Sequence, residues 1–290
     1  MTLVDAVLLG VVEGLTEFLP VSSTGHLILL GERLGHHDEA SKTMDIVIQL
    51  GAVLAVVVYF RARLGQLIRG TLRRDPASLR MTGTLLLAFL PAAVTGLLLH
   101  KIIKARLFGS GPVAVALIVG GVAMIAIEAV RRRNAAPGDD ALEDVSPRRG
   151  LVVGLCQCLA LWPGASRSMT SIVGGQLSGL STRAAAEFSF LLAIPTLGAA
   201  TVFDLLKNGR QLLEAPGGAA ALATGLVVAF VVALAVIASF LRYLRRFGLA
   251  PFGVYRIVLG AVVLAFASGA TPAPTAATGS AAPSAETARR

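Results

Sequence analysis

The chain has 290 residues, of which 55% are hydrophobic and 15% are charged, and its mean hydropathy is +0.75. Because a water-soluble domain carries about 25% charged residues, this composition excludes an ordinary soluble enzyme, a disordered protein and a disulfide-rich secreted scaffold. The net charge of +9 comes from basic clusters between apolar runs, a pattern that reflects membrane topology and not nucleic-acid binding. We therefore predict an all-α, polytopic membrane protein.

Six apolar runs are long enough to cross a bilayer, and in lipid they must be helical to satisfy their backbone groups. In chain order they are residues 44–60, 82–100, 112–130, 185–206, 219–241 and 252–268. Two further regions, residues 3–34 and 150–178, are apolar but are broken by proline and serine near their middle. Proline stops the incoming helix and serine caps the outgoing one, so each region is predicted to be a re-entrant helical hairpin.

Basic residues distinguish the two sides of these predicted spans. Segments 61–80, 131–149 and 242–246 are rich in arginine, and the segments on the opposite side carry fewer basic residues. Since cytoplasmic loops are enriched in Lys and Arg, both termini are predicted to lie outside. The first hairpin then enters from outside and the second from inside. Residues 1–268 are predicted to form one integral membrane domain, followed by a disordered tail over 271–290.

The two halves of the chain, about residues 1–130 and 150–268, share one order of elements, a hairpin followed by three spans. The breaks at 19–23 and 162–166 occupy equivalent places in the two hairpins. Because each half has an odd number of spans, the second half begins on the opposite side of the membrane and crosses it in the opposite direction. The pattern therefore predicts an inverted-topology repeat. Such repeats place a site near the midplane, where the broken helices meet.

The first hairpin carries polar residues that are costly in an apolar environment unless they serve a function. Glu13 and Glu17 are four residues apart and share one helix face, where two carboxylates repel unless a divalent cation or a shared proton lies between them. The polar residues after the break are Ser22, Ser23, Thr24 and His26. Ser23 and His26 are three residues apart on the outgoing helix, so His26 is predicted to act as base or acid beside a Ser23 nucleophile.

The second hairpin supplies complementary groups, which are Ser166, Arg167, Ser168, Thr170 and Ser171. The guanidinium of Arg167 is a permanently charged planar fork that suits phosphate oxygens. It lies at a helix start, where free backbone N–H groups and the helix dipole also favour an anion. Carboxylates and a hydroxyl nucleophile on one hairpin, with a cationic clamp on the other, predict phosphoester or diphosphate chemistry.

These residues also have simpler interpretations. Glu13 and Glu17 are compatible with a structural pair for Arg167 or with a proton relay in a transporter. The serines and Thr24 can be helix N-caps alone, and His26 can be a packed, hydrogen-bonded histidine.

Residues 13–27, EGLTEFLPVSSTGHL, resemble the first signature of the undecaprenyl-diphosphate phosphatase family (BacA/UppP, the bacitracin resistance proteins). Residues 163–168, PGASRS, resemble its second signature, and the resemblance covers residues 1–268. It implies a hydrolase of the plasma membrane that removes one phosphate from undecaprenyl diphosphate on the outer face, with Mg²⁺ or Ca²⁺. That reaction recycles the lipid carrier of cell-wall synthesis and confers bacitracin resistance. The resemblance also implies a homodimer.

By position, the residues that match the family are the acidic pair Glu13 and Glu17, the catalytic Ser23 and His26, and the phosphate-binding Ser166 and Arg167. We therefore predict Glu17, Ser23, His26 and Arg167 as catalytic residues, and Glu13 with Glu17 as metal ligands. The expected phosphate-binding hydroxyls are those of Ser22, Thr24, Ser166, Ser168 and Ser171. The family has threonine where this chain has Ser171, which keeps the hydroxyl, and Thr170 is the alternative.

Two mechanisms are compatible with these assignments: attack by Ser23 on the terminal phosphorus, and direct attack by water with Ser23 only binding phosphate. A transporter or flippase for polyprenyl phosphate is the alternative function, because carriers share the inverted repeat.

Overall fold

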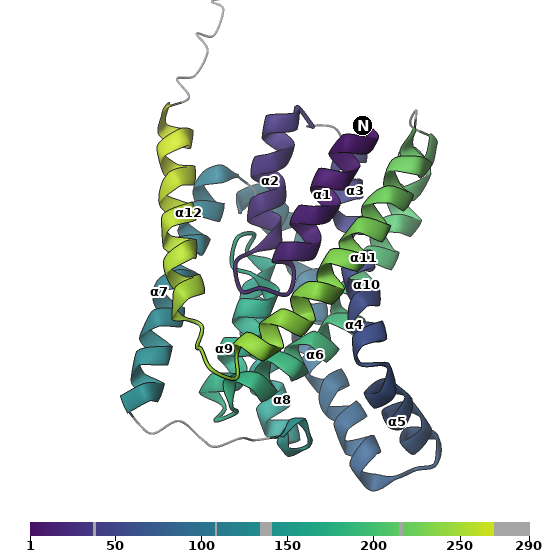
Figure 1. Ribbon diagram of the computed structural model, residues 1–290, viewed down its shortest axis with the longest axis vertical. Coiled ribbons are helices and arrows are strands. Elements are labelled where there is room, and N and C mark those ends of the chain that lie inside the picture. Colours follow the sequence, from purple (N-terminus) through teal and green to yellow (C-terminus); the bar gives the residue numbers. More distant parts are fainter. Residues whose placement is uncertain (37–38, 108, 134–140, 215–216, 270–290) are drawn as a thin grey trace, which may run out of the picture.

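The computed structural model describes residues 1–36, 39–107, 109–133, 141–214 and 217–269, and this part of the chain is helical with no strand (Figure 1). The helices are α1 (Leu3–Thr16), α2 (Ser23–Leu34), α3 (Glu39–Val47), α4 (Gln49–Tyr59), α5 (Arg61–Leu72), α6 (Pro76–Arg106), α7 (Ser110–Arg133), α8 (Pro147–Gln157), α9 (Arg167–Leu177), α10 (Thr182–Glu214), α11 (Gly218–Tyr243) and α12 (Ala250–Gly269). Two short 3-10 helices cover Leu142–Asp144 and Cys158–Leu161. The predicted tail 271–290 lies outside the described residues.

All six runs predicted as spans are helical, but their lengths differ. Among the described residues, four helices are long and apolar enough to cross a membrane, namely α6, α7, α10 and α11. The run predicted at 44–60 is divided between α3 and α4, and the chain then bends by 76° into α5, so this bent pair gives a fifth candidate. The apolar part of α12, Ala250–Ala265, is shorter. The molecule is therefore a multi-pass membrane protein with four or five candidate spans.

The two predicted breaks are confirmed as turns between helices. The first turn joins α1 to α2 before Ser23, and the second joins the short 3-10 helix Cys158–Leu161 to α9 before Arg167. Each outgoing helix is capped by a serine, since Ser22 Oγ accepts the N–H of Gly25 and Ser166 Oγ accepts that of Met169. Figure 1 shows the hairpin of α1 and α2 in the upper part of the molecule and that of α8 and α9 in the lower part.

The two capping serines also share a rare backbone conformation. Ser22 has φ 75° and Ser166 has φ 73°, a region that residues with a side chain seldom adopt. Such conformations cost about 1–3 kcal/mol each and cluster at functional sites. The capping positions of the two turns therefore correspond, so that Ser23 in one hairpin is equivalent to Arg167 in the other.

The halves of the chain exchange their packing partners. Helix α1 packs along α11 and α8 packs along α6, so the first helix of each hairpin contacts the second long helix of the other half (Figure 1). In the same way α7 packs on α12, and α4 packs on α10. This interleaving brings the two hairpin turns together in the interior.

Glycine pairs allow the two hairpin helices to approach their partners closely. Gly10 and Gly14 in α1 face α11, and Gly150 and Gly154 in α8 face α6. A Cβ atom on Gly14 would lie 2.8 Å from the carbonyl oxygen of Ala229, and one on Gly154 would lie 2.4 Å from that of Ala88. The same small-xxx-small pattern therefore fixes both hairpins by backbone contact.

Candidate active site

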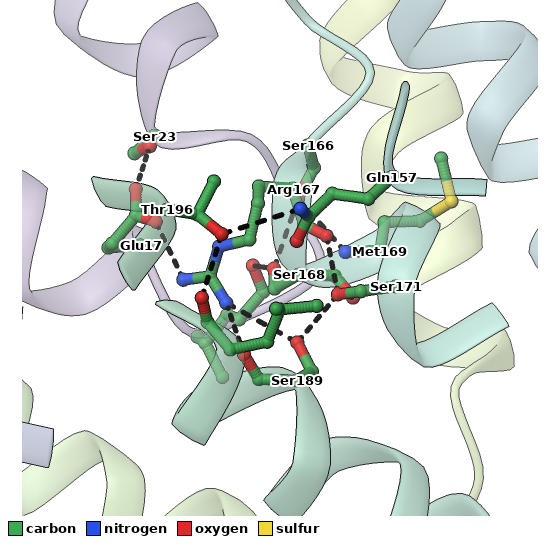
Figure 2. Close-up of polar contacts among 12 residues, drawn as sticks. Glu17, Ser23, Gln157, Ser166, Arg167, Ser168, Met169, Ser171, Ser189 and Thr196 are labelled. Atoms are coloured by element: carbon green, nitrogen blue, oxygen red, sulfur yellow. Dashed lines mark hydrogen bonds and ion pairs between the residues drawn. The ribbon is translucent and has the colours of Figure 1, made fainter. Parts of the chain in front are cut away.

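The site is formed where the end of α1, the two turns, the start of α9 and the middle of α10 meet (Figure 2). Its centre is an ion pair between Glu17 Oε1 and Arg167 Nη2, 2.9 Å apart, which joins residues 150 positions apart in the sequence. Both side chains are buried, with exposed fractions of 5% and 8%. The fold therefore brings the acidic hairpin and the basic hairpin into direct contact, as the sequence predicted.

Glu17 also holds the hydroxyl of Ser23. Ser23 Oγ donates to Glu17 Oε2 over 2.6 Å, while the other carboxylate oxygen accepts from Arg167 (Figure 2). A carboxylate that already accepts the proton of a buried hydroxyl is positioned to act as its general base. Ser23 is therefore placed as a nucleophile, or as a hydroxyl that directs a water molecule.

Arg167 is fixed from several directions. Its Nη1 donates to the carbonyl oxygen of Ser189 over 3.0 Å and to the hydroxyl of Ser189 over 3.3 Å. Its guanidinium carbon lies 5.3 Å from the centre of the Phe18 ring, a cation–π contact. The Nε atom is buried and has no hydrogen-bond partner. The guanidinium is thus held rigidly, and one of its N–H donors has no protein partner.

The hydroxyls predicted to bind phosphate have protein partners. Ser168 Oγ donates to the carbonyl oxygen of Leu19 over 2.8 Å, which ties the second hairpin to the first turn. Ser171 Oγ donates to the carbonyl oxygen of Arg167 over 2.7 Å and shares a 2.6 Å hydrogen bond with Ser189. Thr170 Oγ1 also donates to the Arg167 carbonyl.

Ser22 and Ser166 act as the helix caps described above, and Thr24 is half-buried. These contacts fit the interpretation that the serines stabilise the turns. A phosphate-binding role for these hydroxyls stays a prediction.

His26 lies close to the site but is turned away from Ser23. Its Nδ1 is 2.7 Å from the carbonyl oxygen of Ser22, and its Nε2 is 2.7 Å from the hydroxyl of Tyr255 in α12. The two rings are parallel, with centroids 5.7 Å apart. A carbonyl only accepts, so Nδ1 carries the proton and Tyr255 donates to Nε2 of the neutral ring. The expected contact of His26 with Ser23 is therefore absent, because Glu17 occupies the serine hydroxyl.

Glu13 contributes an unsatisfied carboxylate to the site. It is fully buried, and neither of its carboxylate oxygens has a hydrogen-bond partner. Glu17, Asp45 and Arg167 are all near enough to interact with it electrostatically. A buried carboxylate in this state requires a cation or a proton. Its orphaned oxygens therefore fit the predicted metal.

The protein does not provide a full coordination shell by itself. Within the described ranges, no group of three His, Cys, Asp or Glu side chains is arranged to hold a metal ion. Both oxygens of Glu17 are also engaged by Ser23 and Arg167. A Mg²⁺ or Ca²⁺ ion at Glu13 would take its remaining oxygen ligands from water and from a phosphate, which is common for Mg²⁺.

Three residues near the site were not predicted from the sequence. Ser189 is a small hydroxyl within an apolar run and gives no signal. Tyr255 and Arg256 lie inside the run predicted as the last span, and a charge in such a run indicates a functional position by default. Arg256 could therefore have been found from its charge alone.

Comparison with known proteins identifies the family. The model of "Bacitracin resistance protein BacA" matches residues 6–262. A protein from Sorangium cellulosum named undecaprenyl-diphosphatase is 73% identical over 260 residues, covering 90% of this chain and 85% of that protein. A protein of the same name from Rhizorhabdus wittichii is 50% identical over 264 residues, covering 91% of this chain and 97% of that protein. The chain therefore belongs to the bacitracin resistance protein BacA family.

Proposed function

We propose that this chain is an undecaprenyl-diphosphatase, which hydrolyses undecaprenyl diphosphate to undecaprenyl phosphate and inorganic phosphate. The family match and the names of its relatives support the activity. The structural observation that supports this activity most directly is the contact of Glu17 with two residues. One of its carboxylate oxygens accepts from the Ser23 hydroxyl and the other accepts from Arg167. The reaction recycles the lipid carrier of cell-wall synthesis, and this recycling underlies resistance to bacitracin.

The geometry favours Ser23 as the nucleophile. Ser23 Oγ attacks the terminal phosphorus as its proton passes to Glu17 Oε2, and the bond from phosphorus to the bridging oxygen breaks. Undecaprenyl phosphate leaves, and water then hydrolyses the phosphoserine to release inorganic phosphate. Arg167 stabilises the negative charge on the transferring oxygens throughout. In the variant mechanism, Glu17 takes a proton from water and Ser23 binds the phosphate.

His26 is assigned a supporting role in this scheme. Its ring is held by the carbonyl of Ser22 and by Tyr255, so it fixes the start of α2, on which Ser23 lies. A divalent cation would be held by Glu13, with water and phosphate oxygens as its other ligands, because both oxygens of Glu17 are engaged by Ser23 and Arg167. When bound, it would neutralise the diphosphate charge. The bound cation would then be the partner that the buried Glu13 carboxylate otherwise lacks.

The membrane topology that we infer has six spans and two re-entrant hairpins in an inverted repeat. The exchanged packing of α1 on α11 and of α8 on α6 supports it, as do the matching backbone conformations of Ser22 and Ser166. In this arrangement the turns meet within the bilayer and the site opens to the outside. The family resemblance further suggests that the chain forms a homodimer. The lipid tail lies among the spans, whose outer faces are apolar: Leu97 and Leu98 of α6 are each 75% exposed.

The activity is tested by phosphate release from a polyprenyl diphosphate by the purified protein in detergent. Wild type should release phosphate, and a chelator should reduce the rate. Glu17→Gln, Ser23→Ala and Arg167→Ala should each lower the rate by about 10²-fold or more. An inactive wild type under these conditions, with transport of polyprenyl phosphate across vesicles, would instead support a carrier. A carrier requires charge pairing but no nucleophile held by a base, so the Ser23–Glu17 contact favours the enzyme.

A further inference from the structure

Arg256 is a fully buried guanidinium that the proposed chemistry does not use. It lies in α12 with none of its surface exposed, and no carboxylate of the described residues pairs with it. Burying an arginine without a counter-ion is costly, so its hydrogen bonds must compensate for the lost water. The partners of those hydrogen bonds indicate the structural role of Arg256.

All of the hydrogen bonds of Arg256 go to backbone carbonyl oxygens, and they reach both hairpin turns. Nη1 donates to Pro20 in the first turn over 3.3 Å. Nη2 donates to Gly164 and Ala165 in the second turn, over 2.9 and 3.1 Å, and to Ala116 of α7 over 3.1 Å. Pro20 lies between Glu17 and Ser23, and Ala165 is two residues before Arg167. One side chain therefore binds the two segments that carry the reacting groups.

The neighbouring helix leaves space for this guanidinium. A Cβ atom on Gly120 in α7 would lie 2.4 Å from Nη2 of Arg256 and 3.1 Å from its Cζ. Helix α12 packs along α7 (Figure 1), and the distances from Gly120 show that it faces Arg256 in this contact. Any larger residue at position 120 would push the guanidinium away from the carbonyl oxygens of the turns.

We propose that Arg256 is a positioning residue of the phosphatase, an inference that rests on the proposed function. Its planar fork holds the two turns at the spacing at which Glu17 reaches both Ser23 and Arg167. Without it, carbonyl dipoles from two turns face each other in the interior with no donor. An ammonium is a single point charge, so lysine keeps the charge but cannot hold both turns at once.

The test compares Arg256→Lys and Gly120→Ala with wild type in the phosphate-release assay, together with the melting temperature of each protein. Arg131→Lys is the matched control, because Arg131 also donates to backbone carbonyls, those of Gln176 and Leu180, but at the opposite end of α9. Both site variants should lose kcat by about 10²-fold, as expected for a displaced nucleophile, with KM little changed. Arg131→Lys should keep the wild-type kcat even where its melting temperature falls.

Each outcome decides the question. A wild-type kcat in Arg256→Lys would show that the positive charge alone is sufficient, and would contradict the role of the fork. A wild-type kcat in folded Gly120→Ala would overturn the proposal as well. If Arg256→Lys does not fold, the kcat of Gly120→Ala decides, because that variant keeps the arginine. Failure of the proposed function is separate: it appears as a wild-type protein that is no faster than Glu17→Gln.

Discussion

The candidate site shows how one carboxylate can serve two partners. Glu17 accepts from Ser23 over 2.6 Å and from Arg167 over 2.9 Å, so the proposed base, nucleophile and cationic clamp form one buried chain of contacts. Sequence spacing had paired His26 with Ser23, since both lie on the same helix. The structure pairs His26 with Tyr255 instead, because the histidine ring faces α12 and the serine faces α1.

The fork of Arg167 should be essential beyond its charge. In Arg167→Lys, one ammonium must replace contacts to Glu17 and to both oxygens of Ser189. We expect kcat to fall by about 10²-fold, close to the loss of one oxyanion donor. Arg183→Lys is the control, because Arg183 forms a partly exposed pair with Glu187 within α10. Equal activity of Arg167→Lys and wild type would contradict the clamp role.

Glu13 allows a test that separates metal binding from structure. Without metal, the buried Glu13 carboxyl must hold a proton, and Glu13→Gln supplies a neutral side chain of similar shape, so the two proteins should differ in stability by less than about 1 kcal/mol. Their melting temperatures without cation should then agree within roughly 4 °C. Added Mg²⁺ or Ca²⁺ should raise the melting temperature of wild type and not that of the variant. An equal response of both proteins to the cation would place the metal elsewhere.

Tyr255 should act only through His26. Tyr255→Phe keeps the ring that stacks on the histidine and removes the hydroxyl that lies 2.7 Å from Nε2. Loss of one neutral hydrogen bond of this kind costs about 1 kcal/mol, so kcat should fall less than tenfold. The double variant with His26→Ala should be no slower than His26→Ala alone, as a double-mutant cycle of the two rates would show. Additive losses would mean that the tyrosine contacts substrate by itself.

At the scale of helices, the hairpins depend on close backbone packing. The pairs Gly10 and Gly14 in α1, and Gly150 and Gly154 in α8, have the same spacing and the same function in the two halves. The equivalent breaks are evident in the sequence, whereas the packing role of these glycines appears only in the structure. Each glycine pair lets one hairpin pack closely against a helix of the other half of the chain.

Substitution of a single one of these glycines should destabilise the fold. In Gly154→Ala the new Cβ would lie 2.4 Å from the carbonyl oxygen of Ala88, so α8 must shift at a cost of about 1–3 kcal/mol. The melting temperature should fall by several degrees. Gly83→Ala in α6 is the matched control, because nothing lies within 4 Å of its new Cβ, and its melting temperature should be unchanged or higher. If Gly154→Ala and Gly83→Ala have the same melting temperature, the close packing of α8 on α6 does not contribute to the stability of the fold.

At the scale of the whole molecule, the two halves are interleaved and their turns meet in the interior. The orientation that we propose from the basic loops is tested by labelling with a membrane-impermeant maleimide. In a background where Cys156 and Cys158 are replaced by alanine, Gly109→Cys between α6 and α7 should be labelled on intact cells. Arg73→Cys at the end of α5 should be labelled only after permeabilisation. The reverse pattern would invert the topology and place the site on the cytoplasmic side.

The sequence by itself determined the apolar helices and the two hairpin breaks of this protein, but not helix α5 in the basic segment 61–80. Its composition requires a membrane, and Pro20 with Ser22 and Pro163 with Ser166 determine where the hairpins break, because these signals act on their own neighbours along the chain. Charge in an apolar run also identified Glu17 and Arg167. Helix periodicity fixes which residues share a face, but not which helix lies opposite. The tertiary structure alone decided that Glu17, and not Glu13, pairs with Arg167, that His26 meets Tyr255, and that Arg256 reaches both turns, because these contacts arise only when the two halves pack into each other.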